Sequence, residues 1–256
     1  MIPPPPTGFE RSPISGCDLD DIDMDAVQTY LARRAPTFAE ALPTERLAST
    51  LGLLGGMGSR IGPTTVGLLC FGHLPQLIRP EWGVAAIRID GTTMADPVAT
   101  RVELEGQLGA LLDGGLAFVE AQSRGLKDDL AEYPKEAIRE ALVNALVHRD
   151  YRLTARISLR IFDDRLEIWS PGGIASQLDA ELLLRQGGIS FARNPVLAAT
   201  ARTLGMVDQI GRGLPTIHKT VHESCGRVPR ITSSGADFLV QIPSRLATYT
   251  DGGDAN

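Results

Sequence analysis

Polar and apolar positions alternate with two different periods along the second half of the chain. Residues 155–162 alternate Ile and Leu with Arg and Ser, which is the two-residue period of a strand with one buried face. Asp163 and Asp164 then predict a tight turn, and residues 165–169 return as a second strand. Between residues 134 and 148 the apolar positions instead follow the helical period of about 3.6 residues. This half of the chain therefore combines strands with amphipathic helices.

Periodicity and turn residues also predict the remaining elements. A helical pattern runs through Val27, Tyr30 and Leu31, and a glycine-rich connection at 55–62 leads into a mostly apolar segment at 65–71. We expect further helices over residues 45–54, 102–119, 179–185, 195–204 and 214–224, a strand over 84–89, and a closing hairpin over 230–232 and 236–242. This order predicts an α+β fold in which helices cover one face of a sheet.

The composition is that of an ordinary globular protein, with a formal net charge of −6 and a mean hydropathy near zero. A negatively charged chain has no general attraction to phosphate backbones, so DNA binding would need a local surface or a separate segment. The three cysteines, Cys17, Cys70 and Cys225, lie far apart, which argues against disulfides and a structural zinc site. No long apolar run or signal-peptide pattern occurs, so we expect a cytoplasmic protein without membrane contact.

The helix at 134–148 carries the most distinctive polar side chains. Glu140, Asn144 and His148 are spaced four residues apart and therefore lie along one stripe of the helix. A carboxylate beside a carboxamide can polarise a water and bind Mg²⁺, which prefers oxygen ligands and keeps several waters. The alternative is a polar stripe that only faces solvent. His148, Arg149 and Asp150 lie at the C-terminal end of the helix and can equally serve to fix it to the strand that follows.

Two glycine loops follow this helix in the sequence. The first is Ser170-Pro-Gly-Gly-Ile174, directly after a strand, and the second is Gly211-Arg-Gly213, which opens a helix. Glycine lets the backbone approach a ligand closely, and free amides at a helix N-terminus bind phosphate. A lone G-x-G is a weak signal, but a polar-striped helix, a hairpin and two glycine loops in this order favour a nucleotide site.

Other features point to weaker alternatives. The acidic stretch 18–25 lacks the glycine and closing glutamate of a calcium loop and predicts a helix start. The glycines at 55–62 lack the Gly-Lys-Ser/Thr ending of a phosphate-binding loop. His218 and His222 have zinc-ligand spacing without an evident third ligand, and Trp82 and Trp169 are expected to serve packing.

Four segments form a recognisable set of motifs: residues 133–151 (YPKEAIREALVNALVHRDY), residues 164–173 (DRLEIWSPGG), Arg193-Asn-Pro195 and Gly211-Arg-Gly213. The set resembles the signature of the RecG C-terminal-like, Schlafen/AlbA-associated family of regulators, whose C-terminal domain has a divergent histidine-kinase-like (GHKL) ATPase fold. Residues 63–76 also resemble the end of a Schlafen/AlbA-type domain. Together the resemblance covers residues 18–242.

The resemblance implies a role for each matching residue. Glu140 matches the water-activating, catalytic glutamate, and Asn144 matches the asparagine that binds Mg²⁺. Gly172 and Gly173 match the loop beside the adenine, and Gly211 and Gly213 the loop around the phosphates, while Arg193 and Asn194 lie in or beside the lid over the nucleotide. Asn194 before Pro195 equally reads as a helix cap. The expected cofactors are ATP and Mg²⁺, and the implied cofactor-binding set is Asn144, His148, Ser170, Gly172, Gly173, Arg193, Asn194, Gly211, Arg212 and Gly213.

The chain departs from the GHKL pattern at the adenine loop. Ser170 stands where these ATPases carry an aspartate that accepts a hydrogen bond from the adenine, and Ile174 replaces their last glycine. A neutral hydroxyl accepts more weakly than a carboxylate, which puts adenine selectivity in question. The nucleic-acid-binding core of a Schlafen/AlbA-type domain is also missing from this sequence, and no helicase motif occurs. We therefore expect DNA contact only through a missing or separate domain.

The resemblance implies four regions. Residues 1–33 form an acidic, partly flexible segment, residues 34–126 a remnant of the Schlafen/AlbA-type domain, residues 127–246 a GHKL-like two-layer α/β sandwich, and residues 247–256 a disordered tail. Two functional hypotheses follow. The first is the ATP-binding, weakly ATP-hydrolysing domain of a transcriptional regulator that can form a homodimer. The second is a degenerate scaffold that retains the fold for dimerisation or partner docking and binds no nucleotide.

Overall fold

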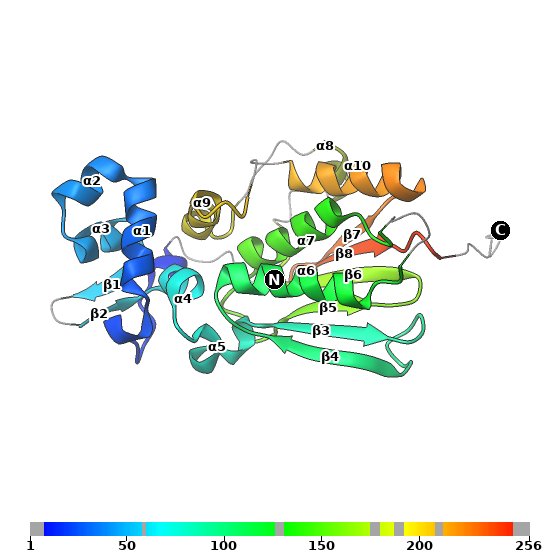
Figure 1. Ribbon diagram of the computed structural model, residues 1–256, viewed down its shortest axis with the longest axis horizontal. Coiled ribbons are helices and arrows are strands. Elements are labelled where there is room, and N and C mark those ends of the chain that lie inside the picture. Colours follow the sequence, from blue (N-terminus) through cyan, green and yellow to red (C-terminus); the bar gives the residue numbers. More distant parts are fainter. Residues whose placement is uncertain are drawn as a thin grey trace.

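The computed structural model describes residues 8–57, 60–125, 131–174, 180–186, 192–207 and 212–247. A smaller, mainly helical part precedes a six-stranded sheet that carries helices on one face (Figure 1). Buried apolar side chains from both parts form one continuous core, from Ile14 and Val27 to Val240 and Ile242. The α+β class expected from the sequence is confirmed.

The N-terminal part consists of short elements. They are η1 (Phe9–Arg11), η2 (Leu19–Asp21), α1 (Met24–Arg34), α2 (Pro36–Ala41), α3 (Thr44–Thr50), β1 (Leu54–Met57), β2 (Arg60–Pro63), α4 (Thr65–Phe71), α5 (Pro75–Ile78) and η3 (Pro80–Trp82). The acidic stretch starts helices, as predicted: the side chain of Asp18 caps η2, and the side chain of Asp23 accepts a hydrogen bond from the backbone N–H of Ala26 in α1. The described residues contain no group of three metal-ligating side chains.

Two predictions for this part are wrong. The helix expected over 45–54 ends at Thr50, because Gly52 adopts a φ of 81° and turns the chain into β1. The glycines expected to form a plain connection lie largely within the β1–β2 hairpin, where Gly55 pairs with Gly62. At Gly56 an added Cβ would lie 2.0 Å from the carbonyl oxygen of Arg60. Only glycine permits strands to approach this closely.

The larger part begins before residue 126. Its elements are β3 (Val84–Ile89), β4 (Val98–Leu104), α6 (Leu108–Gln122), α7 (Lys135–His148), β5 (Ile157–Ile161), β6 (Arg165–Pro171), α8 (Ala180–Gln186), α9 (Pro195–Thr203), α10 (Gly213–Cys225), β7 (Arg230–Ser233) and β8 (Asp237–Pro243). The strand order is β4-β3-β5-β6-β8-β7, and neighbours are antiparallel except for the parallel pair β3–β5. The elements predicted from residue 134 onward agree with the described ones to within about two residues.

The helix predicted over 102–119 is replaced by a strand and a shorter helix. Val102 lies within β4 and pairs with Ala86 of β3. The chain then turns at Gly106, which has a φ of 120°, and α6 begins only at Leu108. The apolar residues Val102 and Leu104 fit either period over so short a window, and pairing with β3 decides the outcome.

Helices α6 and α7 cover the apolar face of the sheet. Leu142 and Leu146 of α7 are fully buried, as are Leu159 of β5 and Leu166 of β6. The two helices pack closely, because at Gly115 of α6 an added Cβ would lie 2.9 Å from Leu142 Cδ1. This arrangement holds α7 firmly between the sheet and its neighbouring helices.

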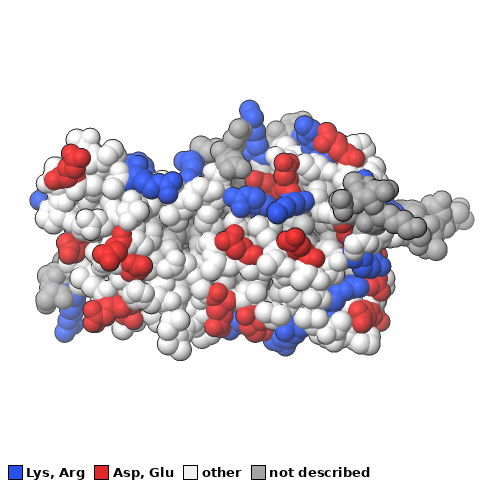
Figure 2. All heavy atoms as spheres, in the orientation of Figure 1, with Lys and Arg blue, Asp and Glu red and all other residues white. Residues whose placement is uncertain are grey.

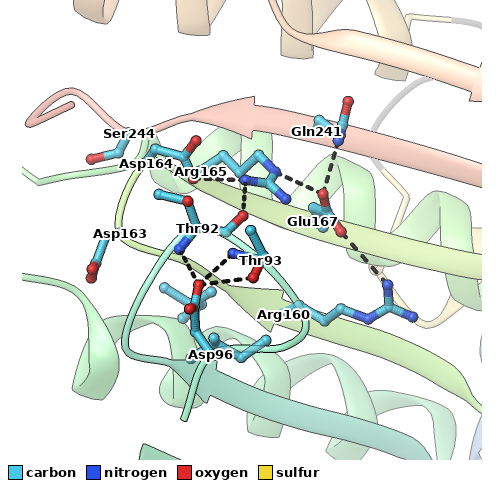
Figure 3. A network of polar contacts seen from close by, with 12 residues as sticks. Thr92, Thr93, Asp96, Arg160, Asp163, Asp164, Arg165, Glu167, Gln241 and Ser244 are labelled. Carbon is cyan, nitrogen blue, oxygen red and sulfur yellow. Dashed lines mark hydrogen bonds and ion pairs between the residues drawn. The ribbon is translucent and has the colours of Figure 1, made fainter. Parts of the chain in front are cut away.

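The opposite face of the sheet is polar. Figure 3 shows Arg160, Arg165, Glu167 and Gln241 on adjacent strands of this face. Glu167 accepts hydrogen bonds from Arg165 Nε at 2.7 Å and Gln241 Nε2 at 2.8 Å. On the face of the molecule seen in Figure 2, acidic and basic side chains are interspersed. No helix within the described residues is long and apolar enough to span a membrane.

Candidate functional site

The polar stripe of α7 meets the N-terminus of α10. Gly213, the first residue of α10, lies so close to this stripe that an added Cβ would be 2.7 Å from Glu140 Oε2 and 3.0 Å from Asn144 Nδ2. The two helices are also in extensive contact along their length. The structure therefore brings Glu140, Asn144 and one glycine of the second loop together, around backbone N–H groups that a helix N-terminus leaves without intrahelical partners.

Asn144 is the unsatisfied member of this group. Its Nδ2 atom is buried and has no hydrogen-bond partner among the described residues. A buried donor without an acceptor costs about 1–3 kcal/mol, so such groups are rare in folded proteins and each one calls for an explanation, such as a role in a functional site. A carboxylate and a carboxamide offer oxygen atoms to a hydrated Mg²⁺, and a helix N-terminus offers N–H groups to phosphate. The residues present therefore fit a Mg²⁺-nucleotide.

His148 lies one turn further along the same stripe. Its side chain is half-buried, and burial together with the positive charge of Arg193 lowers the pKa of His148 to about 4. The imidazole is therefore neutral at physiological pH, with one nitrogen that donates and one that accepts.

The first glycine loop closes this end of α7. Gly172 has a φ of 98°, and an added Cβ would lie 2.8 Å from Asp150 Cβ. At Gly173 an added Cβ would lie 1.6 Å from the carbonyl oxygen of Ser234, in the turn between β7 and β8. Both positions exclude every side chain. The glycines bring the loop against the end of α7 on one side and the β7–β8 turn on the other.

Ser170 is turned away from the loop. Its side chain is buried, and its hydroxyl donates a hydrogen bond to the backbone oxygen of Ala145 in α7 at 3.1 Å. The residue at the position of the usual aspartate thus ties β6 to α7. Its hydroxyl proton is already used within the protein.

Arg193 connects the glycine loop with Asp150. Its guanidinium donates to Asp150 Oδ2 at 3.3 Å and to the carbonyl oxygen of Gly173. Burial alone would raise the pKa of Asp150, but hydrogen bonds from Arg152 and the charge of Arg193 outweigh it and hold that pKa below its ordinary value. Arg152 donates to the same carboxylate at 2.7 Å. Two arginines around one carboxylate leave this cluster with a net positive charge.

The side chain of Asn194 binds the C-terminal end of α7. It occupies the N-cap position of α9, as its place before Pro195 predicts, but its side chain makes no capping bond there. Its Nδ2 instead donates to the carbonyl oxygens of Val147 and Arg149, both at 2.9 Å. Asn194 therefore satisfies carbonyl groups that the C-terminus of a helix leaves unpaired.

Glu10 supplies the missing cap of α9. Its carboxylate oxygens accept hydrogen bonds from the backbone N–H groups of Val196 at 2.8 Å and Leu197 at 2.9 Å. Burial raises the pKa of Glu10, against the lowering effect of these two bonds. No local pattern links residues so far apart in the chain, so sequence reasoning missed this contact.

Arg149 links the end of α7 to the strand that follows, as one of the two interpretations of the sequence predicted. It is fully buried, and its Nη2 donates to the carbonyl oxygens of Leu153 at 2.8 Å and Ala155 at 2.7 Å, just before β5. The same atom donates to the carbonyl oxygen of Glu81 at 3.1 Å. Arg149 thus joins the end of α7 to the chain that enters β5 and to η3.

The remaining candidates lie at the edge of the site or outside it. Arg212 is exposed at the N-cap position of α10, and Gly211 lies outside the described residues. His218 and His222 stack with ring centroids 6.4 Å apart, without a third ligand among the described residues. Trp82 packs edge-on against Tyr151, and Trp169 Nε1 donates a hydrogen bond to Asp237 at 3.1 Å.

Comparison with known proteins bears on this region. Residues 154–242 match the family described as "Putative ATP-dependent DNA helicase recG C-terminal". The match begins after α7, so Glu140 and Asn144 lie outside it. It supports an ATPase-like domain from β5 to β8. A comparison with curated proteins finds no match.

A crystal structure of similar fold is that of the DIP2311 protein from Corynebacterium diphtheriae. The two chains are 25% identical, with a TM-score of 0.64, and the similarity covers 92% of this chain. It covers 46% of that protein, so the present chain spans about half of its length. The similarity extends through both parts of the fold.

Proposed function

We propose that the site between α7 and the N-terminus of α10 binds ATP together with Mg²⁺. The observation that carries the proposal is the meeting of Glu140, Asn144 and Gly213, with the buried Nδ2 donor of Asn144 left without a hydrogen-bond partner among the described residues. The ATPase-like family match over residues 154–242 supports the same ligand class. In this proposal, nucleotide binding serves a regulatory role.

Each residue has a distinct part in this proposal. Asn144 would hold the metal ion through its amide oxygen, and the N-terminus of α10 would bind phosphate through its free backbone N–H groups. When bound, Mg²⁺ neutralises phosphate charge and orients the phosphates. Glu140 accepts a proton from a water molecule beside the phosphates, which supports slow hydrolysis.

The positive cluster at the end of α7 also has a part in this proposal. Arg193 is half-buried and held between Asp150 and the carbonyl oxygen of Gly173, next to neutral His148. Exchange of the Asp150 contact for a phosphate oxygen would keep this guanidinium paired. A shift of Arg193 on ligand binding would therefore move the glycine loop and, through the neighbouring Asn194, α9.

Calorimetric titration with Mg²⁺-ATP tests the proposal. We expect the wild-type protein to bind, Asn144→Ala to lose at least about tenfold in affinity, and Glu140→Ala to bind while losing hydrolysis. Glu136→Ala is the matched control, because Glu136 is exposed one turn earlier on the same helix. Equal affinity in wild type and Asn144→Ala would remove the assignment of this site.

The buried hydroxyl of Ser170 favours a second candidate, a scaffold that retains the fold and binds no nucleotide. A thermal-shift assay separates the two. A ligand at 100 times its dissociation constant adds about 2.7 kcal/mol to the free energy of unfolding, which raises the melting temperature by several degrees. An unchanged melting temperature with Mg²⁺ and each common nucleotide would favour the scaffold.

A further inference from the structure

Strand β4 is an open edge of the six-stranded sheet. Among the described residues, only β3 pairs with it, and its outer side carries a row of backbone groups without strand partners. Figure 1 shows β4 along the lower margin of the sheet, with no element beyond it. Most proteins shorten, bend or cover such an edge, because it is a template for pairing with another strand.

The side chains of this edge are exposed and partly apolar. Val98 is 56% exposed and Val102 39% exposed, although both belong to β4. Arg101 and Glu103 are also exposed, and Figure 2 shows acidic and basic side chains together along this lower margin. A solvent-facing strand with valines and two opposite charges suits a partner strand of matching pattern.

A bulge limits the part of β4 that can pair regularly. Arg88 lies opposite Thr100, but Ile89 lies opposite Val98, so Ala99 is an extra residue. Such a residue bends the strand and interrupts regular pairing. The regular stretch is therefore Thr100–Leu104, and Val102 is its midpoint.

The sequence of this stretch is complementary to itself about that midpoint. In an antiparallel pair of two copies centred on Val102, Val102 faces Val102, Thr100 faces Leu104, and Arg101 faces Glu103 twice. Each opposite-charge pair across strands is favourable. Centred on Arg101 instead, the pair would place two arginines opposite each other, which is unfavourable. Charge therefore selects a single two-fold register.

The charged pair is already arranged on one face. Arg101 Nη2 lies 2.8 Å from Glu103 Oε1 within the same strand, and Nη1 of Arg156, the residue just before β5, lies 2.7 Å from Glu103 Oε2. Leu104, on the alternate face of β4, lies 3.4 Å from the position of a Cβ added at Gly114 of α6. Arg101 and Glu103 therefore project from the face opposite α6. A second copy in the antiparallel register would extend this ion-pair row across the interface.

We propose that two copies of this chain associate through β4, centred on Val102, to form one continuous antiparallel sheet across a two-fold axis. The interface is isologous, since the same strand contributes both sides. It lies on the edge of the sheet away from β7 and leaves the site between α7 and α10 open. The proposal stands independently of nucleotide binding.

Charge-reversal variants test the interface by analytical ultracentrifugation over a range of concentrations. In Arg101→Glu, both cross-strand pairs become Glu against Glu; in Glu103→Arg, both become Arg against Arg. We expect each variant alone to dissociate at least about tenfold more readily than wild type. An equimolar mixture of the two variants should associate again. One copy then contributes only glutamates at these two positions and the other only arginines, so every cross-strand pair joins opposite charges.

Lys219→Glu is the matched control. Its side chain is 73% exposed on α10, against 67% for Arg101, and the change in charge is the same. We expect it to dimerise like wild type. A monomeric wild type at all concentrations, or a dimer that Arg101→Glu leaves intact, would overturn the proposal.

Cysteine cross-linking tests the register. Val102→Cys lies on the two-fold axis opposite its own copy and should form an intermolecular disulfide under mild oxidation. Thr100→Cys faces Leu104 and should not exceed the background of the native cysteines, measured on wild type. Efficient cross-linking of Thr100→Cys with none for Val102→Cys would contradict the register centred on Val102.

Discussion

Gly213 is the glycine that packs directly against the polar stripe of α7. Because an added Cβ would lie 2.7 Å from Glu140 and 3.0 Å from Asn144, any side chain here pushes α10 away from the polar stripe. The backbone N–H groups at the start of α10 would then lose their position relative to Asn144. The glycine therefore permits the close approach of the two helices.

Gly213→Ala should weaken Mg²⁺-ATP binding by about tenfold or more, by displacing α10. The control is Gly109→Ala at the start of α6, where an added Cβ meets no atom within 4 Å. Alanine favours a helix over glycine by about 1 kcal/mol, so Gly109→Ala should stabilise the fold and leave binding unchanged. Equal nucleotide affinity in both variants would show that α10 need not approach α7 closely.

His148 makes stability depend on pH. Its pKa is about 4 in the folded protein, below the ordinary value for histidine, so folding favours the neutral ring. The stability that this contributes is present above pH ~6.5 and is lost as pH falls toward the folded pKa. Arg193 is the nearest charge that opposes protonation, while the carboxylate of Asp150 is already paired.

As pH falls from 7 to 5, protonation of His148 should lower the free energy of unfolding by about 1–2 kcal/mol, after allowance for the partial exposure of the ring. His148→Gln should therefore lose less stability than wild type over this interval in urea unfolding. Parallel pH profiles for the two proteins would contradict the pKa assigned to His148.

At the scale of elements, α9 is held by residues from three separate regions. Glu10 caps its N-terminus, Asn194 joins it to the end of α7, and the hydroxyl of Tyr30 lies 3.5 Å from Thr200. Segments that neighbour the site are thus anchored to the first residues of the described chain. A change at η1 can therefore reach Arg193 through a short, bonded path.

Glu10→Gln tests this anchoring. A glutamine keeps one acceptor oxygen but turns an N–H₂ group toward a second backbone donor, so we expect a loss of about 1–2 kcal/mol in the free energy of unfolding. Amide hydrogen exchange should accelerate at Val196 and Leu197. Glu136→Gln, an exposed change on α7, is the control. Identical exchange in the two variants would argue against the long-range cap.

Elements with a long periodic pattern were predictable from the sequence. The helix with Glu140 and Asn144 and the β5–β6 hairpin follow from local periodicity and turn residues. The helices predicted over 45–54 and 102–119 ran across Gly52 and Gly106, whose positive φ values turn the chain there. Whether the flanks of such glycines form strands depends on partners elsewhere in the chain. The pairing of β3 with β5 and the cap from Glu10 join distant residues, and no local pattern contains them.

At the scale of the molecule, β3 and β4 extend the sheet of β5–β8 into the first half of the chain. The site lies on the helix-covered face near the junction of α7, α10 and the glycine loop, and the proposed dimer uses the β4 edge. The sequence motifs predicted which residues form the candidate site, but the hydrogen bond of Ser170 to Ala145 could be seen only in the structure. The environment of Ser170 therefore depends on tertiary packing.

A crystal structure with Mg²⁺ and a non-hydrolysable ATP analogue tests the central claim most directly. We predict phosphates at the N-terminus of α10, a metal ion on the amide oxygen of Asn144, and Glu140 facing the terminal phosphate. At saturating analogue, a structure with no nucleotide at the N-terminus of α10 and no metal ion on Asn144 would contradict it.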